Sequence, residues 1–99
     1  MSLDGHMDGK KRAGALGESN RGYCGHVQAL DVSPHHSDLP EGELERRLLE
    51  LGFIEGARVE ILHEGLFKRD PIAVRVDDAT VAIRRREAMA IIVKSSSDR

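Results

Sequence analysis

The sequence predicts a mainly β fold, in which a small, strongly bent sheet closes on itself and one α-helix packs across it. Between residues 58 and 93, apolar and polar residues alternate in short runs, which is the period of half-buried strands. Before these runs comes a single leucine stripe at helical spacing. The chain has 99 residues, 39% of them hydrophobic, which limits it to one small domain.

The first 22 residues are rich in Gly, Ser, Asp and Lys, and their few apolar residues follow no period. Such a segment buries too little apolar area to offset the entropy lost on ordering it, so we predict that residues 1–22 are disordered. The Gly5-His6-Met7 triplet within it resembles an expression scar. Residues 25–32 are the first predicted strand, and residues 33–38 have the composition of a loop.

The predicted helix follows this loop. Asp38 and Glu41 have the spacing of a capping box, with Asp38 as N-cap. Gly52 stands where a left-handed residue would end the helix. The apolar stripe between them consists of Leu44, Leu48 and Leu51, and Leu49 widens it.

The remainder of the chain predicts strands separated by short connections. The expected strands are residues 58–64, 72–77, 79–84 and 90–93; residues 65–71 are a loop, and residues 84–89 are a helical turn. Strands this short, each with one apolar face, suit a sheet that bends until it closes. An SH3-like barrel of about five strands, with the helix across one opening, is the economical arrangement.

Several motifs resemble the FeoA family (ferrous iron transport protein A). Residues 46–56, with the sequence RRLLELGFIEG, resemble its pattern R-R-L-x-x-L-G-hydrophobic-x-x-G. Asp70-Pro71 resembles its Gly-Asp-Pro motif, with Arg69 in place of the glycine. Residues 81–88 resemble its A-L-R-x-x-E-A segment, and Ile91 and Val93 match its closing I-x-V. The resemblance lies within a domain predicted at residues 23–94, before a polar tail at residues 95–99.

The resemblance implies an SH3-like fold, no catalysis and a cytoplasmic role beside FeoB, a ferrous iron permease with a GTP-binding domain. We therefore expect a small accessory protein of bacterial ferrous iron transport that binds this permease and modulates it. The same fold forms the carboxy-terminal domain of iron-dependent repressors. The alternative is therefore a metal-responsive regulatory module.

Composition argues against other classes of function. A formal net charge of −2 and only two Phe and one Tyr argue against a nucleic-acid binder. Cys24 is the single cysteine, which favours a reduced, cytoplasmic protein, and no apolar run is long enough to span a bilayer. No nucleophile constellation or phosphate-binding loop stands in the sequence, so we expect no enzyme. The sequence does not decide whether the chain forms a homodimer through an exposed edge strand.

Two basic segments are candidates for a docking surface. An apolar residue flanked by positive charge in a loop can anchor a partner, and consecutive arginines can bind acidic groups. The plainer interpretations are an apolar residue folded back on the barrel and a solvated basic run whose guanidinium groups cannot all share one face. The proposed docking residues are Phe67, Lys68, Arg69, Arg84, Arg85 and Arg86.

Side chains that suit zinc or ferrous iron gather in the first part of the chain. They are Cys24, His26, His35, His36 and Asp38. Their spacing matches no established metal signature. We therefore predict no metal site and no cofactor, leaving open weak binding of ferrous iron or zinc by these residues.

Overall fold

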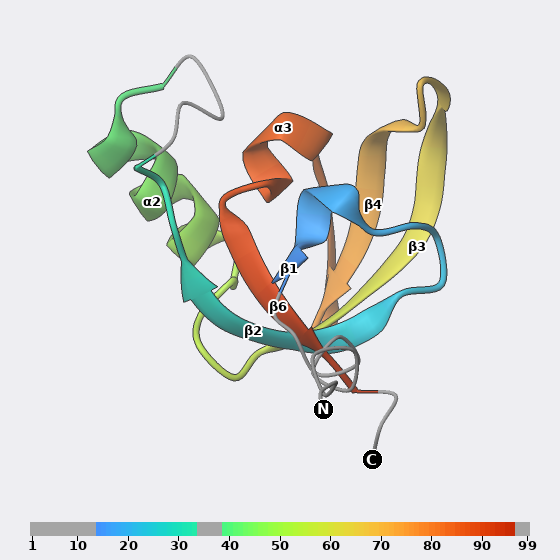
Figure 1. The fold of residues 1–99 in the computed structure, drawn as a ribbon, viewed down its shortest axis with the longest axis horizontal. Helices are drawn as coiled ribbons and strands as arrows, with labels where there is room; N and C mark the ends of the chain where they lie inside the picture. Colours follow the sequence, from blue (N-terminus) through green and yellow to red (C-terminus); the bar gives the residue numbers. More distant parts are fainter. Residues whose placement is uncertain (1–13, 34–38, 97–99) are drawn as a thin grey trace, which may run out of the picture.

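The computed structural model describes residues 14–33 and 39–96, which form one six-stranded antiparallel sheet in the order β1-β6-β2-β3-β4-β5 (Figure 1). Because β1 and β5 remain at its edges, the ladder of hydrogen bonds is not closed. The mainly β, SH3-like architecture with a helix is confirmed. The strands are β1 (Gly14–Ala15), β2 (Cys24–Leu30), β3 (Arg58–Phe67), β4 (Asp70–Val76), β5 (Ala79–Ile83) and β6 (Ile91–Ser95).

The core forms where the apolar face of the sheet meets helix α2 (Glu41–Glu50). Alternation in β4 buries Ile72, Val74 and Val76, each at most 3% exposed, as the sequence predicts. From α2, Leu44 and Leu48 are buried in the same core, whereas Leu49 is 42% exposed. The helix therefore buries a narrower stripe than predicted.

Helix α2 ends in a Schellman motif. The Phe53 N–H donates to the Leu48 carbonyl at 3.0 Å, and the Gly52 N–H donates to the Leu49 carbonyl at 3.0 Å. Gly52 has φ +107°, which confirms the predicted left-handed stop. At the other end the N-cap is Pro40, two residues after the predicted Asp38, which lies outside the described residues. Helix ends are the least sharply encoded part of such patterns.

The connection predicted as a loop at residues 65–71 is instead the end of a long hairpin. Strand β3 continues to Phe67 and β4 begins at Asp70, so only Lys68 and Arg69 join them. Both have positive φ, 56° and 59°, as in the type I′ turns that match the twist of a hairpin. Gly65 allows the strands to approach, because a Cβ there would collide with the Asp70 carbonyl. The usual Asn-Gly signal is missing, which is why the sequence predicts a loop.

Residues 14–22 also differ from the prediction of a disordered segment. Gly14 and Ala15 pair with β6, and Leu16, at the start of the 3-10 turn η1 (Leu16–Glu18), is completely buried. The Gly22 N–H then donates to the Ile61 carbonyl at 2.8 Å. A buried leucine, backbone hydrogen bonds and side-chain contacts from other elements order this segment, although its sequence has no apolar period.

The predicted helical turn is the short helix α3 (Arg85–Ala88). Arg47 of α2 forms a salt bridge with Glu87 of α3, with 3.7 Å between Nε and Oε2. The final strand extends to Ser95, beyond the predicted end at residue 93. Within residues 14–33 and 39–96, no helix has the length and apolar character needed to cross a membrane.

Candidate docking surface

The tip of the β3–β4 hairpin presents two neighbouring apolar side chains to solvent. Leu66 is fully exposed and Phe67 is 86% exposed, so Phe67 does not fold back on the barrel. Figure 1 shows this hairpin reaching away from the body, on the opposite side of the molecule from α2. Lys68 and Arg69, both exposed, complete the tip. We call Leu66, Phe67, Lys68 and Arg69 the hairpin tip.

Arg85 holds the base of this hairpin against the amino-terminal segment. Its Nη2 donates to Glu64 Oε2 at 2.6 Å, and its Nε donates to the Arg69 carbonyl at 2.7 Å. Its Nη1 donates to the carbonyls of Gly17 and Ser19, at 3.0 and 2.7 Å. The Arg85 side chain is only 14% exposed, so its charge serves the fold.

The basic run therefore separates, as its strand-to-turn geometry predicts. Arg84 and Arg86 are exposed, whereas Arg85 is directed inward and is not available to a partner as the docking hypothesis expects. Sequence spacing could not show this, because the acceptors of Arg85 are distant in the chain; Gly17 is 68 positions away. Five of the six proposed docking residues thus lie on the surface.

A second set of contacts holds the hairpin tip in place. Arg69 Nη1 donates to the Asn20 side-chain oxygen at 2.7 Å, and the Arg21 N–H donates to Glu64 Oε2 at 3.2 Å. The tip is therefore attached to the 20–21 turn as well as to Arg85. Leu66 is the tip residue that sequence reasoning missed, and its place beside Phe67 and Lys68 was the available signal.

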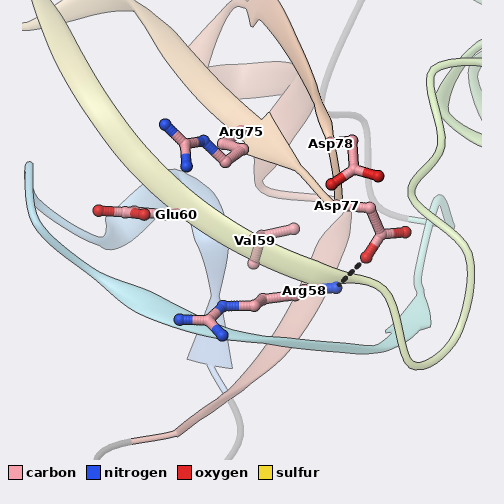
Figure 2. A pocket seen from close by; sticks show the side chains of 6 residues that line it. All are labelled: Arg58, Val59, Glu60, Arg75, Asp77 and Asp78. Atoms are coloured by element: carbon pink, nitrogen blue, oxygen red, sulfur yellow. Dashed lines mark hydrogen bonds between the residues drawn. The ribbon is translucent and has the colours of Figure 1, made fainter.

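A shallow pocket of 340 Å³ lies over the start of β3 and the turn between β4 and β5. Figure 2 shows the Asp77 carboxylate accepting a hydrogen bond from the Arg58 N–H, at 3.0 Å, which fastens this turn to β3. The lining mixes both signs of charge and contains no nucleophile. It consists of Arg58, Val59, Glu60, Arg75, Asp77 and Asp78.

The proposed metal ligands that the structure describes do not assemble into a site. Cys24 and His26 lie two residues apart on β2, and residues 14–33 and 39–96 contain no group of three or more His, Cys, Asp or Glu side chains that could hold a metal ion. His35, His36 and Asp38 lie outside the described residues.

Burial, and to a lesser degree the neighbouring Cys24, raises the pKa of Tyr23.

One protein family and several solved structures are similar to this chain. A profile of the FeoA domain matches residues 25–95. FeoA from Chlorobium tepidum is 28% identical with a TM-score of 0.66, over 83% of this chain and 70% of that one. FeoA from Stenotrophomonas maltophilia, solved in complex with zinc and described as a prokaryotic SH3 domain protein, is 26% identical with a TM-score of 0.63, over 80% of this chain and 87% of that one.

A manganese-dependent transcriptional repressor shares the same fold. It is 27% identical with a TM-score of 0.67, over 86% of this chain but only 42% of the repressor. No protein in the curated set matches the sequence significantly. The family profile covers most of the chain, including the leucine helix and all strands but β1. The chain belongs to the FeoA family.

Proposed function

We propose that this protein is a small, non-catalytic, cytoplasmic accessory of ferrous iron transport that binds a FeoB-like permease and modulates it. The match of the FeoA domain across residues 25–95 carries this proposal. It is supported by the likeness to FeoA from Stenotrophomonas maltophilia, whose description raises a role as a ferrous iron transport activating factor. The protein acts by binding, without a cofactor of its own.

The proposed docking surface, which meets the permease and the membrane around it, consists of the hairpin tip together with Arg84 and Arg86. Exposed aromatic and arginine side chains, here Phe67, Arg84 and Arg86, are residue types enriched where proteins contact each other. Arg84 precedes α3, where Glu87 accepts a hydrogen bond from its N–H at 3.4 Å. Arg84 is exposed, and its guanidinium can bind an acidic group of the permease.

The experiment is a calorimetric titration of the full chain against the isolated GTP-binding domain of a FeoB-like permease, with and without ferrous iron. We expect saturable binding that does not depend on the metal. The double variant with Arg84→Ala and Arg86→Ala binds the domain about tenfold more weakly, because each lost charge pair contributes roughly 0.5–1 kcal/mol to the binding free energy. Arg75→Ala removes another exposed arginine, in β4 and outside the proposed docking surface, and leaves the affinity unchanged. Equal effects of both changes would exclude this docking surface.

The likeness to the manganese-dependent repressor supports a second candidate, a metal-responsive regulatory module. Such a module would take up ferrous iron or zinc stoichiometrically without any partner, and the metal would change its association with another chain. Cys24, His26, His35 and His36 are then the residues to replace. The same titration, with metal alone in the syringe, separates the candidates.

A further inference from the structure

Leu66 and Phe67 are adjacent in sequence, yet both are exposed at the end of β3. The register of β3 against β4 shifts between Glu64 and Phe67, and both apolar side chains are almost completely exposed, so a protein surface that contacts the tip from one direction would leave much of their apolar area in water. A lipid interface, in contrast, surrounds an inserted hairpin on all sides. Two unpartnered large apolar side chains at a projecting tip therefore fit insertion into an interface better than docking on a face.

The charges around these two residues favour an anionic surface. Lys68 and Arg69 follow them directly, and Arg21 is exposed in the turn that bonds to Glu64. The two carboxylates of the hairpin base are directed inward, since Glu64 and Asp70 both accept hydrogen bonds from Arg85. Glu18, in η1, is an exposed acid beside this region. Local positive charge at the tip contrasts with the net charge of −2 for the chain.

The tip is also held in one shape before any contact is made. Arg85 bonds to the Arg69 carbonyl and Arg69 bonds to Asn20, at 2.7 Å each. A loop that is already ordered loses little conformational entropy when it binds. The long side chains of Lys68 and Arg69 can lay their methylene stems along an apolar surface while the charges stay at headgroup level.

We propose that the hairpin tip inserts Leu66 and Phe67 into the interface of an anionic lipid bilayer, with Lys68, Arg69 and Arg21 on the headgroups. The proposal deepens the proposed function, because a permease lies in a membrane: the tip contacts lipid beside it, and Arg84 and Arg86 face the protein. Two apolar side chains and a few cations give weak, reversible attachment. Binding to the permease then adds to this attachment through effective concentration.

Vesicles without any permease test the proposal. The chain contains no tryptophan, so Phe67→Trp creates a single fluorescent reporter at the tip. We expect its emission to shift to shorter wavelength with vesicles of equimolar phosphatidylcholine and phosphatidylglycerol, and much less with phosphatidylcholine alone. Ile54→Trp is the matched control, because Ile54 is also exposed, at 52%, but lies after α2. The tryptophan introduced at position 54 keeps its aqueous emission.

Co-sedimentation measures the same binding with natural residue types. Leu66→Ser and Phe67→Ser each lower the vesicle partition coefficient about fivefold or more, and Lys68→Ala lowers it about fivefold. Ile54→Ser changes nothing. Unchanged emission at position 67, or equal shifts at positions 67 and 54, would overturn the proposal. A third outcome would also overturn it: the parent chain does not bind vesicles, and Phe67→Ser loses binding to the isolated GTP-binding domain. That outcome would assign the tip to a protein pocket. Since that domain assay contains no lipid, failure of lipid binding leaves the permease proposal intact.

Discussion

Arg84, Arg85 and Arg86 are consecutive, and the guanidinium of Arg85 donates four hydrogen bonds within the fold. The planar group presents donors in several directions at fixed angles, which suits three backbone carbonyls and one carboxylate at the same time. The Glu64 side chain is 18% exposed and forms a salt bridge of 2.6 Å with Arg85. Removing the guanidinium takes the salt-bridge partner away from the Glu64 carboxylate and one donor away from each of three carbonyls.

We expect Arg85→Met to lower the free energy of unfolding by about 3 kcal/mol, because methionine keeps the apolar stem but loses every guanidinium hydrogen bond. Arg85→Lys should cost about 1–2 kcal/mol, since one ammonium group keeps the charge but cannot reproduce the fork. Urea unfolding followed by circular dichroism measures both changes. Arg84→Met, at an exposed position, should stay within about 0.5 kcal/mol of the parent. Equal midpoints for Arg85→Met and Arg84→Met would show that this network does not contribute to stability.

The β3–β4 hairpin has a long ladder with two register shifts, and its two turn residues are unfavourable. Lys68 and Arg69 adopt left-handed backbone angles that cost residues with a Cβ roughly 1 kcal/mol or more each. Asparagine and glycine meet this conformation at lower cost, which explains their preference in type I′ turns. The hairpin therefore places charge at its tip at the expense of turn stability.

Replacing Lys68 with asparagine tests this account of the turn. We expect Lys68→Asn to raise the free energy of unfolding by about 0.5–1 kcal/mol, because asparagine accepts positive φ more readily. The readout is the urea midpoint of the variant against that of the parent. Lys94→Asn is the matched control: Lys94 is exposed in β6 and does not have positive φ, so asparagine should bring no gain there. If Lys68→Asn is no more stable than the parent, the turn is not strained in solution.

Elements with a sustained period could be predicted from the sequence, and those that depend on distant contacts could not. Leu44 and Leu48 identify α2, and alternation at Ile72, Val74 and Val76 identifies β4. The docking hypothesis requires Phe67 to be exposed, and its exposed fraction is 86%. It requires Arg85 to be exposed as well, whereas that side chain is directed inward. The sequence could not show this, because Gly17 and Glu64 come close to Arg85 only in the folded chain.

The whole molecule extends beyond the part that the family profile covers. The profile begins at residue 25, yet Leu16 is completely buried in the core, and Gly17 and Ser19 each supply a carbonyl acceptor to Arg85. Small domains bury a limited apolar area, so one additional buried leucine is a substantial fraction of their net stability. Sequence reasoning missed this segment because Leu16 is an isolated apolar residue among polar neighbours, and isolated residues have no period.

Two leucine substitutions measure what the segment contributes to the complete fold. We expect Leu16→Ala to lower the free energy of unfolding by about 2–4 kcal/mol, through lost apolar burial and the cavity left behind. Leu66→Ala makes the same chemical change at a fully exposed position, so it should change stability by less than about 0.5 kcal/mol. Urea unfolding of the full chain measures both. If Leu16→Ala were as mild as Leu66→Ala, residues 14–22 would contribute nothing to the core, and the domain would be limited to the range of the family profile.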